Sequence, residues 1–278
     1  MLGAGGFLGK RLTATLADAG AAVIALTRRE VDLTAPDAEQ TLSAHLQDGD
    51  TLVFLSAITP DKGRDSGALM RNLAMGRAVC AVAAKTKLSH IVYASSDAVY
   101  PFTSALIADD TPAAPVDLYG AMHRTREILL AAEAPAPLAV LRFTAVYGPG
   151  DTHNSYGPNR FVRQAVTERR IPLFGEGEEL RDHLYVDDGA AVLRKAIERR
   201  STGTLNVVSG SSRTFRSVAD RIAAACDAAV APSPRNNPVT HRHFDATPLL
   251  TAFPDMRFTS FEEGLDRTLA AAREAARA

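Results

Sequence analysis

The fold is decided by the stretch Gly3-Ala4-Gly5-Gly6-Phe7-Leu8-Gly9, close to the start of the chain. Gly3, Gly6 and Gly9 have the spacing G-x-x-G-x-x-G, and the stretch leads into apolar residues at helical spacing. Glycines at this spacing let a strand turn tightly into a helix, whose N-terminal amides attract a pyrophosphate. The stretch therefore predicts a nucleotide-binding turn, with a plain structural turn as the alternative.

The segment ahead of this turn is short. Only Met1 and Leu2 precede Gly3, whereas a strand in this position usually has about five or six residues. In a doubly wound sheet this strand is central and pairs on both sides. We therefore expect the natural start to lie upstream, or the sequence to be trimmed, by roughly four to eight residues of apolar strand.

A βαβ pattern extends from the turn to about residue 132. Nearly continuous apolar runs, typical of strands buried on both faces, alternate with segments of helical periodicity. We expect strands at 21–27, 51–56, 90–95 and 138–143, and helices at 7–19, 36–47, 67–85 and 118–132. The pattern predicts an α/β fold, a Rossmann doubly wound parallel sheet over residues 1–150.

The second half has a different texture. A polar stretch at 151–159 and a proline-rich stretch at 231–238 are expected to be loops. We expect helices at 160–169, 187–199, 215–228 and from 260 to the end, and strands at 171–174 and 204–208. Ser260 followed by Glu263 is a capping-box pattern for the last helix. Residues 151–278 are therefore predicted to form a smaller α+β substrate-binding cap that is interleaved with the sheet.

The composition of the 278 residues is that of an ordinary globular protein, with 46% hydrophobic and 23% charged residues. A formal net charge of -1 argues against general attraction to nucleic acid or to anionic membranes. No signal peptide or membrane-spanning stretch is visible. Cys80 and Cys226 lie in alanine-rich helical segments, which is typical of buried thiols. We expect a cytoplasmic protein that binds neither nucleic acid nor membranes.

The end of the second expected strand bears on the coenzyme. An acidic residue there commonly binds the ribose hydroxyls of NAD, but this chain has Thr27-Arg28-Arg29. A guanidinium can pair with the 2′-phosphate of NADP, so the segment favours NADP. Glu30 and Asp32 are acidic residues close by, so NAD remains an alternative coenzyme. A further alternative is that the two arginines lie in a solvated basic turn and bind no coenzyme. Asp32 and Leu33 are expected to flank the adenine.

A more specific pattern follows. The strand at 90–95 runs into Ser95-Ser96-Asp97-Ala98-Val99-Tyr100, and Tyr119-Gly120-Ala121-Met122-His123 opens the next helix. The other segments in order are Asn72 with Gly76, Leu141-Arg142, Val146-Tyr147-Gly148-Pro149-Gly150, Gly175-Glu176-Gly177, Arg181-Asp182-His183-Leu184-Tyr185-Val186-Asp187-Asp188, Leu205-Asn206-Val207-Val208-Ser209-Gly210 and Ser260-Phe261-Glu262-Glu263-Gly264-Leu265. Over nearly its whole length the chain resembles the extended short-chain dehydrogenase/reductase family of sugar-nucleotide epimerases, dehydratases and 4-keto-reductases.

The resemblance implies roles for three catalytic positions. Tyr119 would be the acid/base that moves the hydroxyl proton, and Ser96 would hydrogen bond the reacting oxygen. His123 stands where the family has the lysine of Tyr-x-x-x-Lys, which binds the nicotinamide ribose and lowers the pKa of the tyrosine. An imidazole with a pKa of about 6.5 is mostly neutral and lends less charge, although it can still bind the ribose. Lys62 is a candidate replacement for the missing charge, and a solvated loop lysine is the alternative.

The resemblance also implies two sets of binding residues. The expected coenzyme contacts are Gly3, Gly6, Phe7, Leu8, Gly9, Arg28, Arg29, Asp32, Leu33, Leu55, Ser56, Ala57, Asn72, Tyr119 and His123. The expected substrate contacts are Ser96, Asp97, Ala145, Asn159 and Arg181. Arg181 is the best candidate for the diphosphate, because a guanidinium grips phosphate oxygens in a bidentate manner, with an ion pair to Asp182 or Asp187 as the alternative.

Two departures from the family narrow the reaction. Ala98 replaces the glutamate that the 4,6-dehydratases use as a base, which disfavours dehydration. Ala145 stands where many members carry an asparagine near the substrate. No metal is expected, since His241-Arg242-His243 lacks a second cluster of ligands.

The sequence therefore predicts an NAD(P)-dependent epimerase or 4-keto-reductase that acts on a nucleotide-activated sugar. A homodimer through the helices at 67–85 and 118–132 is expected from the resemblance. Two other hypotheses stay open: a catalytically weak NAD(P)-binding sensor or scaffold, motivated by His123, and a reductase of a non-sugar carbonyl.

Overall fold

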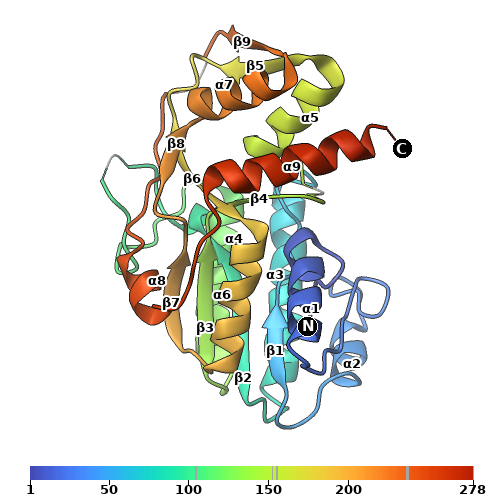
Figure 1. Ribbon diagram of the computed structural model, residues 1–278. Coiled ribbons are helices and arrows are strands. Elements are labelled where there is room, and N and C mark those ends of the chain that lie inside the picture. The colour runs from blue at the N-terminus through green and yellow to red at the C-terminus, as the bar shows by residue number, and fades with distance from the viewer. Residues whose placement is uncertain (104, 152, 155, 236–237, 278) are drawn as a thin grey trace. The chain divides into compact units, whose positions relative to one another are not determined.

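The computed structural model describes residues 1–103, 105–151, 153–154, 156–235 and 238–277. The chain forms two compact units (Figure 1). The first contains Met1–Pro101, Asp109–Phe143 and Gly189–Val207, and the second contains Phe102–Ala108, Thr144–Asp188 and Val208–Ala278. The chain thus returns to the first unit after residue 150, through Gly189–Val207.

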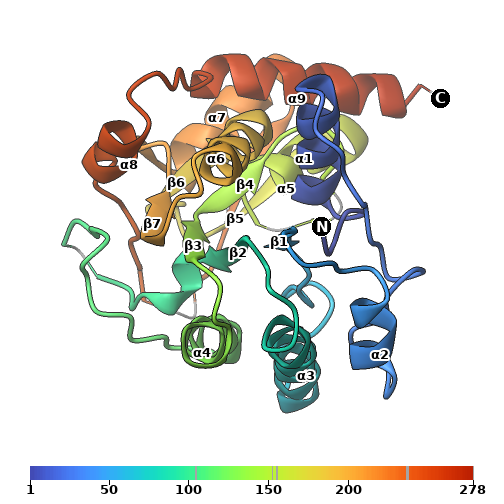
Figure 2. The same cartoon turned by 90° about the horizontal axis from the view of Figure 1, so that it is seen from below.

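The first unit is built on a parallel sheet. Its four strands lie in the order β1 (Thr51–Phe54), β2 (His90–Ser96), β3 (Leu138–Phe143) and β7 (Gly203–Val207). Helices α3 and α4 cover one face and α1 and α6 cover the other (Figure 2). This is the doubly wound parallel α/β arrangement, so the predicted fold class is confirmed.

The edge of the sheet beyond β1 differs from the prediction. Leu2 forms parallel bridges to both Phe54 and Leu26, so the segment before the glycine turn does lie between its two expected neighbours. The expected strand at 21–27 is nevertheless wrong in extent, because only Leu26 is paired and residues 21–25 are largely exposed. Few contacts hold this segment: Leu26 bridges Leu2, and the amino group of Met1 donates to the carbonyl oxygen of Ile24 at 2.8 Å.

The helices of the first unit lie where the periodicities predict them, except that the helix expected at 36–47 extends only over Ala38–Ser43. They are α1 (Phe7–Asp18), α2 (Ala38–Ser43), α3 (Ser66–Ala83), the 3-10 helix η1 (Asp97–Val99), α4 (Leu118–Glu133) and α6 (Val186–Glu198), whose first three residues belong to the second unit. The side chains of Asp65 and Asp117 cap α3 and α4 by accepting from the amides of Ala68 and Gly120. The apolar faces of α2, α3 and α4 pack against β1 and β2 and form a buried hydrophobic core with them.

The second unit holds more strands than the sequence predicted. A three-stranded sheet has the order β4 (Ala145–Tyr147), β6 (Leu180–Tyr185) and β8 (Ser212–Thr214), and β5 (Arg170–Phe174) pairs in parallel with β9 (Ala229–Ser233). The expected loop at 231–238 is therefore wrong over 231–233, which belong to β9. Pro232 fits this two-stranded sheet because each strand has a single partner. Residues 236 and 237 of that loop lie outside the described residues.

Four helices complete this unit: α5 (Pro158–Glu168), α7 (Phe215–Cys226), α8 (Thr247–Ala252) and α9 (Phe261–Ala275). The hydroxyl of Ser260 accepts from the amide of Glu263, so the capping pattern predicted for α9 is confirmed. α5, α7 and α9 pack around Phe161, Phe215 and Leu265. Among the helices of the described residues, none is both long enough and apolar enough to cross a membrane.

Candidate active site

The glycine turn needs its glycines. Gly3 has a φ of +84°, and a Cβ atom there would lie 2.9 Å from the amide nitrogen of Ser56. A Cβ atom at Gly9 would lie 2.2 Å from the carbonyl oxygen of Gly3. The turn, the first turn of α1 and the loop after β1 therefore come together only because these positions lack side chains. The amides of a first helical turn lack acceptors within the helix, which suits a pyrophosphate.

The residues after Leu26 carry both signs of charge. Arg28 donates from Nε to Oδ2 of Asp32 at 3.0 Å, and its side chain stays 81% exposed. Glu30 reaches back to Thr27, whose backbone amide and hydroxyl donate to Oε2 at 2.8 and 2.6 Å. These hydrogen bonds lower the pKa of Glu30 below its usual value. The carboxylate of Glu30 thus lies beside Thr27, at the position after Leu26 where NAD-binding sites commonly have an acidic residue.

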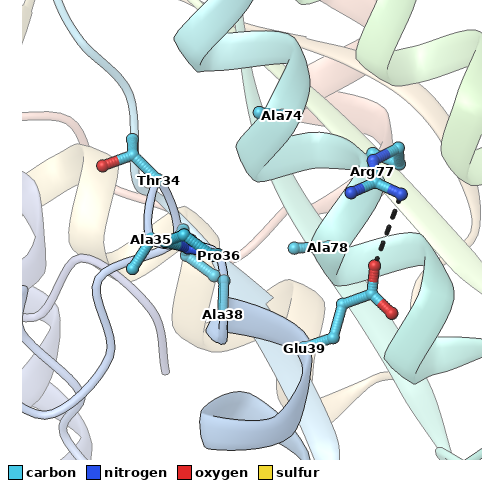
Figure 3. Close-up of a pocket in the computed structure, with 9 residues that line it drawn as sticks. Thr34, Ala35, Pro36, Ala38, Glu39, Ala74, Arg77 and Ala78 are labelled. Atoms are coloured by element: carbon cyan, nitrogen blue, oxygen red, sulfur yellow. Dashed lines mark ion pairs between the residues drawn. The ribbon is translucent and has the colours of Figure 1, made fainter.

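Leu33 lines a cavity of about 200 Å³ between the segment 33–39 and α3. In Figure 3 the segment with Thr34, Ala35 and Pro36 lies on one side of the cavity, and Ala74 and Ala78 of α3 lie on the other. The ion pair between Arg77 and Glu39, at 3.5 Å, joins the two sides. Leu33, which was expected to flank the adenine, is therefore buried beside a small cavity of the first unit.

Ser96 lies at the junction of β2 and η1. Its hydroxyl accepts from the amide of Ala98 at 3.2 Å and donates to Oδ1 of Asp97 at 3.3 Å. The first turn of α4 packs directly on this element, because a Cβ atom at Gly120 would lie 2.0 Å from the carbonyl oxygen of Ala98. The packing brings the turn that carries Tyr119 next to the element that Ser96 caps.

Tyr119 is half-buried, and its ring meets the ring of His123 edge-on at 4.6 Å between centroids. Burial raises the pKa of Tyr119 above its ordinary value, and the neighbouring Tyr93, Asp97 and Asp117 raise it further. A general acid or base at neutral pH needs the opposite shift. An acid/base role of Tyr119 would therefore depend on groups that favour the ionised phenol.

His123 is 2% exposed, and its Nδ1 lies 2.7 Å from the hydroxyl of Tyr93. Its Nε2 is buried and has no hydrogen-bond partner among the described residues. Burial, and then the charge of Arg126, hold the pKa of His123 well below 6.5. The imidazole is consequently neutral at neutral pH, with one ring nitrogen left for a ligand. This orphaned nitrogen and the crowded glycine turn both fit a dinucleotide.

Asn72 and Arg126 join three parts of the first unit. Asn72 holds the loop after β1, since Oδ1 accepts from the amide of Ile58 at 2.9 Å and Nδ2 donates to its carbonyl at 3.0 Å. Arg126 donates to the carbonyl oxygens of Asn72 and Ser56 at 2.6–2.9 Å. Sequence reasoning missed Arg126. Its spacing of seven residues from Tyr119 and three from His123 puts all three on one helix face, but an arginine in a helix is usually solvated.

A buried ion pair fixes α4 to the sheet and was also missed. Arg142 donates to both carboxylate oxygens of Glu127, at 2.9 and 2.8 Å, and Ser95 donates to the same carboxylate at 2.6 Å. Arg142 also donates to the hydroxyl of Tyr100 at 2.8 Å. The pair therefore holds α4 against β2 and β3.

The other three expected substrate residues, Ala145, Asn159 and Arg181, belong to the second unit. Ala145 is exposed at the start of β4, and Asn159 accepts from the amide of Gly148 at 3.1 Å. Arg181 donates to the carbonyl and hydroxyl oxygens of Thr240 at 2.7 and 2.9 Å and lies over the ring of Phe102. Thr240 and Phe102 thus hold the guanidinium, while the carboxylate of Asp182 accepts from Ser209 and Ser211.

Two curated relatives are similar to parts of the chain. dTDP-L-rhamnose 4-epimerase from Burkholderia thailandensis is 35% identical over 125 residues, which cover 42% of this chain and 34% of that protein. ADP-L-glycero-D-manno-heptose-6-epimerase from Nitratidesulfovibrio vulgaris (strain DP4) is 27% identical over 224 residues, which cover 73% of this chain and 68% of that protein. The chain thus spans about a third of the first relative and about two thirds of the second.

A solved structure, MoeE5 in complex with UDP-glucose and NAD, superposes with a TM-score of 0.86 at 22% identity, covering 99% of this chain and 98% of that one. This likeness supports the fold. The sequence model described as "NAD dependent epimerase/dehydratase family" matches residues 1–208. Because this match covers far more than half of the 278 residues, the chain belongs to the NAD-dependent epimerase/dehydratase family, as its resemblance to the extended short-chain dehydrogenase/reductases predicted.

Proposed function

We propose that the protein is an NAD(P)-dependent enzyme that epimerises a nucleotide-activated sugar or reduces its 4-keto form, with Tyr119 as the acid/base. The main support is the packing of Gly120 on Ala98. It brings the first turn of α4, which contains Tyr119, against η1, which Ser96 caps. The names of the similar proteins favour the same substrate class, since they are epimerases of nucleotide-linked sugars.

The residues divide the work as follows. A nicotinamide coenzyme, when bound, accepts or supplies a hydride at the sugar carbon. Tyr119 takes or returns the proton of the sugar hydroxyl, and Ser96 donates a hydrogen bond to that oxygen and steadies its charge. The unpartnered Nε2 of His123 hydrogen bonds a ribose hydroxyl of the coenzyme. The glycine turn and the first turn of α1 bind the pyrophosphate.

Of the two coenzymes, this proposal favours NADP and keeps NAD as the alternative. Arg28 is exposed enough to pair with a 2′-phosphate even while Asp32 holds it, and Arg29 follows it on the same exposed turn. Use of NADP favours net reduction, because a redox-neutral epimerase of this family usually keeps NAD bound. The carboxylate of Glu30 at Thr27 is the feature that favours NAD instead.

Dehydration is disfavoured because Ala98 offers no base. This residue is buried in η1, directly after Asp97, and has only a methyl side chain. Removal of a proton from a sugar carbon needs a base within hydrogen-bond reach. We expect the diphosphate of the substrate to bind Arg181, with Asn159 as a weaker contact.

The proposal is tested by purifying the protein, identifying any bound nucleotide, and measuring NADPH and NADH oxidation with a panel of 4-keto sugar nucleotides. Epimerisation is followed by NMR of the sugar. Tyr119→Phe should lower kcat by about a hundredfold or more, the usual worth of acid/base catalysis, and should retain coenzyme binding. Turnover at the wild-type rate in Tyr119→Phe would overturn the assignment of this residue.

A second candidate function is that of a coenzyme-binding sensor with little catalysis. Two observations favour it. The pKa of Tyr119 is raised, and the neutral His123 stands where the family has a charged lysine. Coenzyme binding without turnover on any carbonyl substrate would support it.

We further propose a homodimer formed through α3 and α4. These two helices pack side by side on one face of the sheet (Figure 2). Met70 on α3 and Ile128 on α4 are 63% and 52% exposed. A second copy of the chain would cover both side chains if these two helices formed the interface.

A further inference from the structure

Arg126 is a charged residue that the expected catalytic set does not include. Its side chain is 0% exposed, although arginine is almost never fully buried without a partner of opposite charge. It occupies the space left by Gly76 on α3, since a Cβ atom there would lie 3.0 Å from Cγ of Arg126. The guanidinium is therefore built into the interior of the first unit.

The partners of Arg126 are neutral. Its nitrogens donate to the carbonyl oxygens of Asn72 and Ser56 and to Oδ1 of Asn72, and the guanidinium carbon lies 4.8 Å from the ring centroid of Phe54. Within the described part of the chain, Arg126 forms no ion pair with a carboxylate. Its positive charge is consequently uncompensated in a region of low dielectric, where it acts strongly on nearby groups.

Arg126 also lies close to Tyr93, the hydrogen-bond partner of His123. Its charge lowers the pKa of that phenol against the larger effect of burial. The hydroxyl of Tyr93 lies 2.7 Å from Nδ1 of His123 and has a proton to donate to it. A histidine that accepts at Nδ1 carries its proton at Nε2, the nitrogen without a partner.

The groups that act on Tyr119 come from each element around it. Tyr93 on β2, Asp97 on η1 and Asp117 at the N-cap of α4 all oppose its ionisation, as burial does. Among the groups that act most strongly on Tyr119, the charge of Arg126 is the one that favours ionisation. The neutral His123 contributes a ring contact and no charge.

Resting on the proposed function, we propose that Arg126 is a positioning residue that supplies the positive charge favouring the ionised form of Tyr119. The two tasks of the family's lysine are then divided along α4: His123 offers a hydrogen bond to the coenzyme ribose, and Arg126, three residues further on and fully buried, provides the charge. Arg126 acts through the protein interior and touches neither substrate nor coenzyme.

The direct test measures the ionisation of residue 119 in the protein without substrate. Fluorotyrosine incorporated at position 119 brings the phenol into a measurable pH range, and its titration is followed by ¹⁹F NMR. Arg126→Gln should raise the pKa by about one unit, a tenfold smaller ionised fraction. Arg126→Lys should restore most of the shift, and Lys62→Ala, which removes a solvated lysine, should change nothing. An unchanged titration in a folded Arg126→Gln would overturn the proposal.

Activity gives a second test, and one of its two variants leaves Arg126 unchanged. In the direction in which Tyr119 accepts a proton, kcat/KM rises with pH through the pKa of Tyr119, so Arg126→Gln should move this limb to higher pH. His123→Lys in the wild-type background should gain less than about threefold, because Arg126 already supplies the charge and repels a second cation. A gain of tenfold or more would contradict the proposal even if Arg126→Gln did not fold.

These readouts separate the two proposals. If Tyr119→Phe keeps full activity, the proposed acid/base is wrong, while the NMR titration still reports whether Arg126 acts on residue 119. If the titration does not respond to Arg126→Gln but Tyr119→Phe is inactive, the proposed function stands and the role of Arg126 fails.

Discussion

A Cβ atom at Gly120 would lie 2.0 Å from the carbonyl oxygen of Ala98, so the first turn of α4 and the 3-10 helix after β2 touch through their backbones. Gly120→Ala must push α4 away from η1, and with it the ring of Tyr119. We expect a loss of stability of about 1–3 kcal/mol from overpacking and a fall in kcat of tenfold or more. Chemical denaturation and steady-state kinetics measure the two effects.

Gly67→Ala is the matched control for this prediction. Gly67 also lies in the first turn of a long helix, α3, but the nearest atom to its Cβ position is the flexible end of Arg71 at 3.3 Å. The guanidinium can move, and alanine favours a helix by about 1 kcal/mol over glycine. Gly67→Ala should keep full activity. Equal losses in both variants would show that the close approach at Gly120 is unimportant.

The ion pair between Glu127 and Arg142 is buried on both sides, with exposed side-chain fractions of 4% and 6%. Glu127→Gln leaves Arg142 charged and without its carboxylate, so we expect a loss of about 3–5 kcal/mol in the free energy of unfolding. Glu198→Gln, which removes a half-exposed partner of Arg194 on α6, should cost less than about 1 kcal/mol. Urea unfolding curves compare the two variants, and similar costs would contradict the argument.

The sequence predicts the parallel sheet because its strands are buried on both faces and therefore read as unbroken apolar runs, as in Leu52–Phe54 and Ile91–Tyr93. β6 was missed for the opposite reason: Arg181, Asp182 and His183 make it read as polar, although Asp182 and His183 are buried with their neighbours in the second unit. Short runs such as β4 and β8 have no periodicity to detect.

The candidate site was predictable only where a motif fixes the residue. The glycines follow from their spacing along the chain, and Tyr119 and Ser96 follow from the resemblance to the family. Arg126 was not predictable, because its burial depends on the space at Gly76 and on the carbonyls of Ser56 and Asn72, which are distant in sequence. The ion pair of Arg28 with Asp32 was equally hidden, since each residue by itself favours a different coenzyme.

Removing the arginine cluster tests the coenzyme preference. The double variant Arg28→Ala with Arg29→Ala should bind NADPH tenfold or more weakly, because a charge-assisted hydrogen bond to phosphate contributes about 1.5–3 kcal/mol. Binding of NADH, which lacks the 2′-phosphate, should change little and serves as the internal control. Fluorescence titration gives both dissociation constants. An equal loss for both coenzymes would show that the arginines only support the fold.

The proposed dimer is tested on α4. Ile128→Glu places a charge among apolar side chains of an interface and should convert a dimer to a monomer at micromolar concentration. Ile24→Glu changes an equally exposed isoleucine that lies outside α3 and α4, so it should leave the assembly unchanged. Light scattering after gel filtration gives the masses. A wild-type monomer, or a dimer that persists in Ile128→Glu, would exclude this interface.

His183 gives a prediction about pH and stability. Its side chain is 4% exposed, both ring nitrogens lack hydrogen-bond partners among the described residues, and the rings of Tyr147, Phe215 and Phe261 surround it. Burial, together with the charges of Arg181 and Arg213, lowers the pKa of His183 to about 3. Below about pH 6.5 this histidine therefore binds a proton in the unfolded chain but stays neutral in the folded protein. The free energy of unfolding consequently falls as the pH drops below that value.

His183→Phe should remove this penalty, because a phenyl ring fits among aromatic neighbours and leaves no polar atom unpaired. The variant should be as stable as the wild type or more so at pH 7.5, and its advantage should grow by about 1 kcal/mol at pH 5.5, since one proton changes stability by about 1.4 kcal/mol per pH unit. Urea unfolding at both pH values measures the difference. An advantage that stays constant with pH would show that His183 is hydrated or charged in the folded protein.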